Sequence, residues 1–286
     1  MVPRLRIMSV PLTTEQLEAF QRDGFVVVRG FYEAAEIEPI QRGIHAIIGL
    51  VMEEQGLTIE QPPFAPENFD GGFQELIAHD RALGGRVYDA VKQIPAFIRL
   101  VASTKHEAVV RQVRATDQPA IAAGGYGIRI DNPQEEKFRA GWHQDYPAQI
   151  RSLDGVVFWS PLVAMTPELG PVEFCVGSHR DGLAPVQEMD EANPDKTGAY
   201  GLTLVDEEAR VANYKKTAPL TEPGDLVLVD FLTLHRSGKN VSDRSRWSLQ
   251  LRWFNFVEPT GRKLGWPGAY AAGKDLRAVH PELVVD

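Results

Sequence analysis

The sequence GWHQDY, residues Gly141–Tyr146, is the stretch from which we work out the fold and the site. His143 and Asp145 within it are separated by one residue. Side chains alternate between the two faces of a β-strand, so on a strand both would point to the same side. A second histidine, His235, lies far downstream and could reach the same point from another strand. The pattern predicts a metal site between the strands of a β-rich fold.

Two imidazoles and one carboxylate on one face of a metal are the ligand set of non-haem Fe(II) oxygenases, and they leave coordination positions free for other reactants. A His-X-Asp pattern on its own also occurs by chance, and a lone His143 would more often have a structural role. The metal interpretation gains weight because Ser237 and Arg246 follow His235, with Arg246 at the start of an apolar, aromatic stretch.

The segment His235–Ser237, followed by Arg246 about a strand later, resembles the phytanoyl-CoA dioxygenase family of Fe(II)/2-oxoglutarate oxygenases. The resemblance covers nearly the whole chain apart from its C-terminal end. One departure is Leu169, where many members carry Asn before a glycine, and this changes a turn without changing the chemistry. Other segments that match the family are Leu12–Phe31, Val156–Leu162, Glu168–Phe174 and Gly177–Arg180.

The resemblance implies roles for five residues. His143, Asp145 and His235 would bind Fe(II), while Arg246 and Ser237 would hold the far carboxylate of the cosubstrate 2-oxoglutarate. O2 would be the second cosubstrate, and the enzyme would hydroxylate an unactivated C–H bond of a small-molecule metabolite with release of succinate and CO2. Halogenating relatives carry a small residue in place of the carboxylate, so Asp145 implies hydroxylation or desaturation instead.

Two other functions stay open on the sequence. A non-catalytic jelly-roll protein could keep the metal for structure or sensing, although a carboxylate-binding arginine such as Arg246 disfavours this function. A cupin-type metal hydrolase or isomerase would usually need more histidines on the metal and has no use for Arg246.

The alternation within Arg246–Phe254 supports the placement of Arg246. If Arg246 points inward, the residues that follow it on the same face are Ser248, Gln250, Arg252 and Phe254, and the tryptophans and leucines between them face the covering helices. So polar an inward face suits the lining of a site, and the planar fork of arginine grips a carboxylate with two hydrogen bonds. Arg252 lies too far along the strand to share that carboxylate.

Four further residues are candidates for the pocket. Trp159, in an apolar segment, is expected in the core and in the wall of the cofactor pocket. Arg129 lies on the strand before the metal stretch, and Gln149 and Arg151 lie just beyond that stretch. Relatives use the region of Arg129 for the near end of the cosubstrate or for the substrate, and an ordinary surface position is the alternative for all three residues. We predict that Arg129, Gln149 or Arg151 contacts one polar group of the substrate.

The composition excludes several classes of protein. The chain has 286 residues, 43% of them hydrophobic, with a net charge of −9 and a pI near 5.4. The negative charge argues against binding of nucleic acid and of anionic membrane surfaces. The single cysteine, Cys175, excludes an internal disulfide and a cysteine-rich metal site. No apolar run suits a membrane helix or a signal peptide, so we expect a soluble, cytoplasmic protein. The sequence does not decide the oligomeric state, and a homodimer is one alternative.

We predict a single domain over residues 1–286 with a mainly β, double-stranded β-helix (jelly-roll) core at about 108–258. A helical layer at about 12–105 would cover its outside. The segment at about 181–221 is predicted to be a lid insertion, and the tail after Glu258 to be irregular. The expected strands are Tyr126–Ile130, Gln144–Gln149, Gly155–Pro161, Val172–Val176, Gly224–Leu234 and Arg246–Phe256.

The charge of the segment 181–221 bears on the substrate. It carries more acidic than basic residues, and this excess would repel a polyanion such as a CoA thioester at the point of entry. The pair Lys215–Lys216 is a short counter-signal. We therefore expect a small neutral or cationic metabolite.

Overall fold

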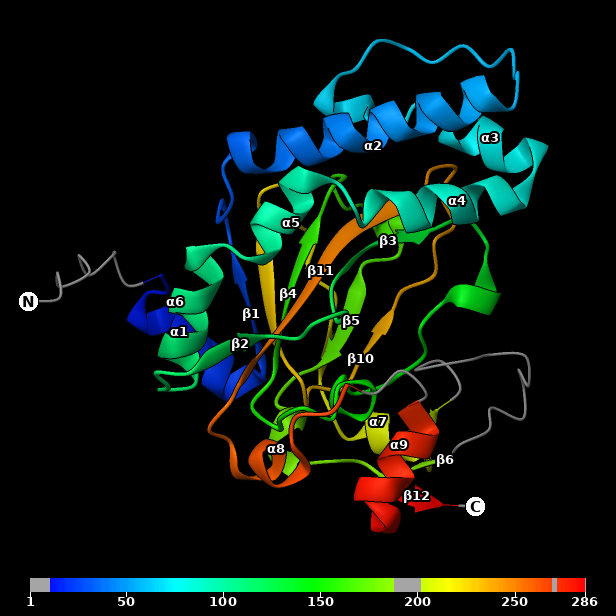
Figure 1. Ribbon diagram of the computed structural model, residues 1–286. Coiled ribbons are helices and arrows are strands. Elements are labelled where there is room, and N and C mark those ends of the chain that lie inside the picture. The colour runs from blue at the N-terminus through cyan, green and yellow to red at the C-terminus, as the bar shows by residue number, and fades with distance from the viewer. Residues whose placement is uncertain (1–10, 188–201, 269–271, 286) are drawn as a thin grey trace, which may run out of the picture.

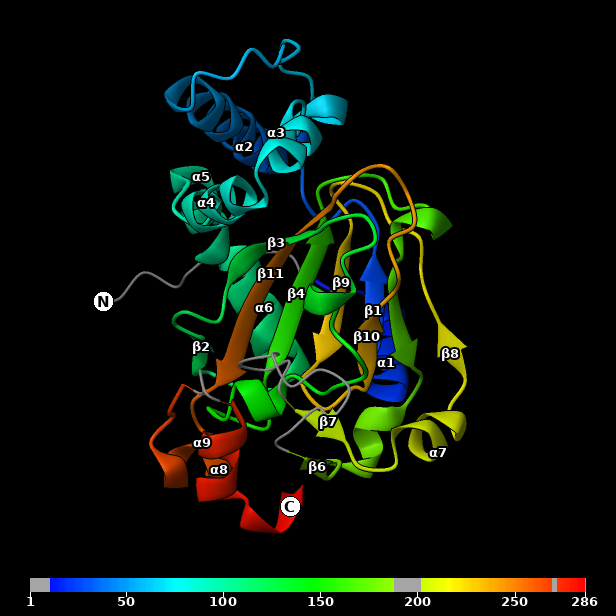
Figure 2. The same cartoon turned by 90° about the vertical axis from the view of Figure 1, so that its right-hand side faces the viewer.

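A computed structural model describes residues 11–187, 202–268 and 272–285 of the chain. Its larger sheet has the strand order β1-β9-β4-β11-β2, with β3 also paired to β11, and a three-stranded sheet of order β10-β5-β8 lies opposite (Figure 2). The strands of the larger sheet are β1 (Phe25–Val28), β2 (Pro119–Ile121), β3 (Gly127–Asp131), β4 (Val156–Pro161), β9 (Leu226–Asp230) and β11 (Arg246–Asn255). Those of the smaller sheet are β5 (Val172–Cys175), β8 (Lys216–Thr217) and β10 (His235–Ser237).

Helices cover the outer side of the larger sheet (Figure 1). The two tryptophans of β11 show how: Trp247 packs edge-on against Phe69 and Phe73, and Trp253 packs against His106. This is the helical cover that the sequence predicts. Within the same stretch of the chain, β1 forms an edge strand of the larger sheet. The helices of this layer are α1 (Thr14–Asp23), α2 (Ala34–Glu54), α3 (Phe73–His79), α4 (Arg81–Val91), α5 (Pro95–Val101) and α6 (Thr104–Val113).

Local sequence signals set the beginning and the end of α1. The Thr13 hydroxyl accepts from the backbone N–H of Gln16, and the Gln16 side chain accepts from the backbone N–H of Thr13, so two otherwise unpaired N–H groups are satisfied. Gly24 ends the helix with φ of 82°, a left-handed conformation that glycine adopts at little cost. A Cβ at Gly24 would lie 2.4 Å from the Thr233 hydroxyl, so the turn also needs glycine for space.

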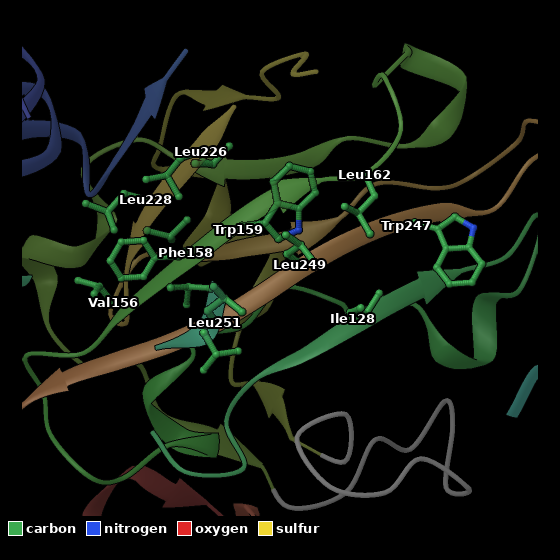
Figure 3. Close-up of a cluster of buried hydrophobic side chains, with 14 of the residues drawn as sticks. Ile128, Val156, Phe158, Trp159, Leu162, Leu226, Leu228, Trp247, Leu249 and Leu251 are labelled. Carbon is green, nitrogen blue, oxygen red and sulfur yellow. The ribbon is translucent and has the colours of Figure 1, made fainter. Parts of the chain in front are cut away.

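The core lies between the helical layer and the larger sheet. Every residue of β4 and of β9 is buried, as expected for strands covered on both faces. Figure 3 shows the apolar side chains that fill this core, which include Val156 and Phe158 on β4, Leu226 and Leu228 on β9, and Leu249 and Leu251 on β11. Cys175 is free and buried, and burial raises the pKa of its thiol to about 11.

The expected strand Gln144–Gln149 is wrong. The chain forms a 3-10 helix at Tyr146–Ala148, because the backbone N–H groups of Asp145 and Tyr146 both point to the carbonyl of Phe231, at 3.0 and 3.3 Å. Only His143 keeps strand-like pairing, as an isolated antiparallel bridge to His235.

The tail after Glu258 is also more regular than expected. Glu258 accepts from the N–H groups of Thr260 and Gly261 and so caps α8 (Pro259–Leu264). A further helix, α9 (Ala272–Val279), lies against the 3-10 helix Tyr146–Ala148, and His280 after it binds the Tyr146 hydroxyl at 2.9 Å. The C-terminal end of the chain therefore packs against the segment that directly follows Asp145.

The predicted lid, 181–221, is described only in part, because residues 188–201 lie outside the described residues. Its described portion holds α7 (Glu207–Ala212) and contributes β8 to the smaller sheet. It also contributes β6 (Val186–Gln187) and β7 (Thr203–Leu204), which form a third sheet with β12 (Val284–Val285). The lid function itself stays a prediction. Among the described helices, none has the length and apolar character needed to span a membrane.

We predict that His106 makes the protein less stable in acid. It is fully buried, its Nε2 lies 2.7 Å from the Tyr32 hydroxyl, and burial lowers the pKa of His106 to about 3. Below the ordinary value of about 6.5, the unfolded chain takes up a proton that the folded chain refuses, so stability is complete above that pH and falls towards pH 3. Within this range each pH unit lowers the free energy of unfolding by about 1.4 kcal/mol.

Urea unfolding of the wild type and of His106→Gln at pH 7, 6 and 5 checks this. As the pH falls, the free energy of unfolding of the variant should decrease less steeply than that of the wild type. The difference in slope should correspond to about one proton, the one that the unfolded wild type takes up at His106. All other histidines are the same in both proteins, so parallel slopes would contradict the role of His106.

Candidate active site

His143, Asp145 and His235 come together in the folded chain. One ligand atom from each lies within 4.8 Å of the others. The two histidines exchange backbone hydrogen bonds of 2.9 and 3.0 Å, which sets their rings side by side with centroids 4.2 Å apart. The backbone bridge thus joins two stretches that are far apart in sequence.

Both histidines present Nε2 to the site. The Nδ1 of His143 lies 2.8 Å from the carbonyl of Gly141, and the Nδ1 of His235 lies 2.9 Å from that of Thr233. A carbonyl only accepts, so each Nδ1 carries the proton and donates it. The unprotonated Nε2 is then free to bind a metal, an arrangement typical of metal-binding histidines.

Asp145 supplies the third acceptor. Its Oδ1 accepts a hydrogen bond from Nε of Arg252 at 2.8 Å and lies 2.7 Å from Nη2 of the same guanidinium, with which it forms an ion pair. Its Oδ2 is buried and has no hydrogen-bond partner, and it lies 3.4 Å from Nε2 of His235. A buried carboxylate oxygen without a donor is costly unless something positive completes it. The three residues therefore fit a divalent cation with nitrogen and oxygen ligands.

The protonation states in the site also favour a cation. Burial, reinforced by the neighbouring His235, lowers the pKa of His143 to about 3. Burial alone would raise the pKa of Asp145, but Arg252 and the two imidazoles outweigh it, and this pKa falls to about 2. At neutral pH the site thus offers neutral imidazole and an ionised carboxylate, the forms that bind metals.

The three residues line a cavity of about 90 Å³ between the two sheets. Val157 and Trp159 of β4 and Val229 of β9 form one wall, and Val172 and Phe174 of β5 form the opposite one. The remaining lining residues are Arg129, Ala140, Ala148, Ser237, Gln250 and Arg252.

Arg246 stands at one end of β11 with its side chain 1% exposed. Its Nη2 donates to the Ser237 hydroxyl at 2.9 Å and to the Asp131 carboxylate at 2.7 Å, and its Nη1 donates to the carbonyl of Gly170. Ser237 and His235 point to the same side of β10, while Arg236 between them pairs outward with Glu173 of the next strand.

The expected alternation along β11 holds for most of the strand. Gln250 and Arg252 line the cavity, and Trp247 and Trp253 face the helices. Phe254 departs from the expectation, because it packs with Ala120 and Ala122 in a separate small cluster.

The structure divides the three predicted substrate residues. Arg129 lines the cavity, where its Nε lies 2.9 Å from each carboxylate oxygen of Asp131. Gln149 and Arg151 are buried, hydrogen-bond to each other and stand outside the described lining. Arg151 also donates to the carbonyl of Ala123 at 2.6 Å. Trp159 is both buried and part of the wall, as expected.

The sequence reasoning places Arg252 on the inward face of the strand but does not predict its partner, which is Asp145. It does not identify Asp131 at all. Asp131 is the direct cross-strand neighbour of Arg246, and Arg129 and Arg246 together hold its pKa at about 2 despite burial, which alone would raise it. The register of β3 against β11 was the missing signal.

Comparison with known proteins places the chain in a family. The sequence matches the family described as phytanoyl-CoA dioxygenase (PhyH) over residues 20–248. The chain belongs to the phytanoyl-CoA dioxygenase family. The resemblance seen in the sequence is therefore confirmed, and with it the enzyme class, a 2-oxoglutarate-dependent non-haem iron dioxygenase. Crystal structures of EctD from S. alaskensis have been solved with 2-oxoglutarate and with bound Fe, and the triad of this chain offers a place for a metal ion.

Individual relatives of this family member are distant. Ectoine dioxygenase from Sphingopyxis alaskensis is 24% identical over 82% of this chain and 73% of its own length. The phytanoyl-CoA dioxygenase domain-containing protein 1 from Bos taurus is 25% identical over 87% of this chain and 91% of its own.

Solved structures agree with the expected fold. The crystal structure of EctD from S. alaskensis with 2-oxoglutarate and 5-hydroxyectoine covers 86% of this chain and 77% of its own, with a TM-score of 0.55 at 20% identity. The non-heme alpha ketoglutarate dependent carbocyclase SnoK from nogalamycin biosynthesis covers 85% and 84%, with a TM-score of 0.56 at 16% identity. The jelly-roll class is confirmed, although the described strands form separate sheets and no closed barrel.

We predict that His143→Ala and His235→Ala each weaken iron binding by about a hundredfold or more, because each removes one of three ligands. The fold should survive, since both side chains face the cavity and not the apolar core. Anaerobic Fe(II) titration measures the affinity, and circular dichroism checks the fold. His45→Ala is the matched control, because His45 binds the carbonyl of Pro62 far from the cavity. Unchanged iron affinity in either site variant would refute the ligand assignment.

Proposed function

We propose that the chain hydroxylates an unactivated C–H bond of a small-molecule metabolite, using Fe(II), 2-oxoglutarate and O2 and releasing succinate and CO2. The observation that carries the proposal is the occurrence, within one fold, of a three-acceptor cluster and a buried arginine–serine pair. His143, Asp145 and His235 make the cluster, and Arg246 and Ser237 make the pair. The ligand set leaves coordination positions for the cosubstrates, and the pair supplies the donors for a carboxylate.

The metal-binding residues are oriented by the protein itself. Gly141 and Thr233 fix the two imidazoles through their carbonyls, and Arg252 occupies one oxygen of Asp145, which leaves the other for the metal. The bound iron supplies the activation of oxygen, which no protein side chain can perform. The fold contributes a prepared face of three ligands that needs little rearrangement.

Arg246 and Ser237 hold the far carboxylate of 2-oxoglutarate in this proposal. A buried guanidinium is a strong partner for a carboxylate, because the surroundings screen the charges weakly and the fork matches both oxygens. The Ser237 hydroxyl already accepts from Arg246, so its own proton is available to the same carboxylate.

The walls of the cavity serve to exclude water. Val157, Trp159, Val229 and Phe174 surround the cluster with apolar surface. The cavity of about 90 Å³ is small beside the pockets of roughly 300 Å³ or more that take drug-sized ligands, which supports a small reacting group. Arg129 is the residue among the three predicted substrate contacts that we retain for a polar group of the substrate.

A non-catalytic metal-binding or sensing protein is the alternative function. The two functions differ when Fe(II) and 2-oxoglutarate are added without oxygen. Chelation of iron by the cosubstrate gives a weak visible charge-transfer band, and admission of oxygen then produces succinate. A protein that binds iron without this band and without succinate would support the alternative.

We predict that Arg246→Ala weakens 2-oxoglutarate binding about thirtyfold or more, because removing one partner of a buried charge pair costs about 2–5 kcal/mol. Arg246→Lys should recover only part, since lysine lacks the fork. Calorimetric titration of 2-oxoglutarate into the anaerobic Fe(II) protein measures this. Arg244→Ala is the control, because Arg244 pairs with Asp70 outside the cavity. Full affinity in the alanine variant would place the carboxylate elsewhere.

We predict that a small neutral or cationic metabolite, and not an acyl-CoA ester, stimulates succinate formation. The net charge of −9 and the acidic excess of residues 181–221 oppose a polyanion. The similarity to ectoine dioxygenase also supports a small molecule. Succinate is measured with matched acyl-CoA esters, free acids and amines against the rate without substrate. Efficient, coupled turnover of an acyl-CoA would refute the charge argument.

A further inference from the structure

The guanidinium of Arg246 is only partly paired. Its Nη2 donates to Asp131 and to Ser237, which uses both of its hydrogens, and its Nη1 donates to the carbonyl of Gly170. Its Nε is buried and has no hydrogen-bond partner in the described structure. Such a donor costs free energy until an acceptor reaches it.

The geometry of arginine decides what can complete this group. A carboxylate binds the fork either through Nε and Nη2 or through Nη1 and Nη2, so both modes need Nη2. Other pairs of this chain use the first mode, among them Arg236 with Glu173 and Arg244 with Asp70. On Arg246 the same mode is half filled, because Nε is empty and Asp131 holds Nη2 through one oxygen.

Asp131 has a second cationic partner, with which it can stay paired when it leaves Arg246. Arg129, two residues earlier on β3, contacts its carboxylate through Nε at 2.9 Å and Nη2 at 2.7 Å. Asp131 could leave Arg246 and still remain paired. Ser237 can keep its hydrogen bond with Arg246, because a hydroxyl that accepts from Arg246 can also donate to an incoming carboxylate.

We propose that Asp131 is a placeholder carboxylate, which occupies Nη2 of Arg246 while the cosubstrate is absent and yields it to the far carboxylate of 2-oxoglutarate. This inference rests on the proposed function. Asp131 then stays on Arg129 alone, and the incoming carboxylate takes the full Nε–Nη2 fork together with the Ser237 hydroxyl. The exchange satisfies the orphaned Nε without leaving any charge unpaired.

The arrangement also sets the affinity for the cosubstrate. Arg129, Arg246 and Asp131 together carry one net positive charge, which one bound carboxylate neutralises. Because the cosubstrate must displace an internal competitor, its affinity is lower than the bare arginine would give. The same competitor keeps Arg246 paired when the pocket has no cosubstrate, so the buried guanidinium is never left uncompensated.

Asp131→Asn tests the exchange, because asparagine keeps the shape but loses the competing charge. Asp70→Asn is the matched control, a carboxylate with 9% exposure that pairs with Arg244 outside the cavity. Each protein is loaded with Fe(II) without oxygen and titrated calorimetrically with 2-oxoglutarate. A parallel titration uses 2-oxopentanoate, which has the same chelating end and chain length but no far carboxylate.

The exchange predicts that Asp131→Asn binds 2-oxoglutarate about tenfold more tightly than the wild type, as expected for removing one charged hydrogen bond that competes. Affinity for 2-oxopentanoate should not change, and Asp70→Asn should match the wild type with both compounds. Unchanged or weaker binding of 2-oxoglutarate by Asp131→Asn would overturn the placeholder role, since a purely structural aspartate supports Arg246. A wild type that binds no 2-oxoglutarate would overturn the proposed function itself.

A second variant guards against misfolding of the first. Arg129→Gln removes the cation with which Asp131 stays paired after leaving Arg246. The variant should therefore bind 2-oxoglutarate several-fold more weakly, and adding Asp131→Asn to it should restore the affinity. Circular dichroism establishes that each variant is folded before titration. An Arg129→Gln protein with wild-type affinity would also overturn the exchange.

Discussion

The pair of backbone hydrogen bonds between His143 and His235 is the constraint on which the site depends. It fixes the stretch around residue 143 against β10, although His143 lies outside every strand of the described sheets. The carbonyl of Phe231 then receives the N–H groups of Asp145 and Tyr146, which turns the chain and aims the carboxylate at the two rings. Backbone pairing, and not side-chain attraction, therefore brings the three candidate ligands together.

Charge pairing governs the rest of the cavity. Buried charges are costly alone and tolerable only with partners, and each charged group here has one. Arg252 compensates Asp145 beside the two histidines, and Asp131 links Arg129 of the cavity lining to Arg246, which lies outside that lining. Both clusters draw on β11, whose alternation turns Arg246 and Arg252 to one side and the tryptophans to the helices. One face of β11 thus contributes apolar side chains to the core, and the other contributes polar side chains to the site.

The sequence predicts the parts of the site that a short spacing encodes. His143, Asp145, His235 and the Ser237–Arg246 pair follow from local motifs, and the helical cover follows from apolar periodicity. Asp131 could not be assigned, because its role depends on the register of β3 against β11, which joins residues far apart in the chain. The strand expected at Gln144–Gln149 fails for a similar reason, since a distant carbonyl overrides local alternation. The cap of α8 was readable in principle, because Glu258 precedes a proline at a helix start.

A buried polar atom without a hydrogen-bond partner indicates a functional group only when other polar groups point to the same place. Several buried polar atoms of the described structure have no hydrogen-bond partner, and one, Nε1 of Trp253, lies in the core between helix and sheet. Such a buried donor costs stability and does not by itself mark a site. Oδ2 of Asp145 differs because two imidazole rings face it, and Nε of Arg246 differs because Nη2 of the same guanidinium pairs with the carboxylate of Asp131. In the proposed function, a cation completes the first place and a carboxylate completes the second, and one chelating dicarboxylate cosubstrate together with its metal supplies both.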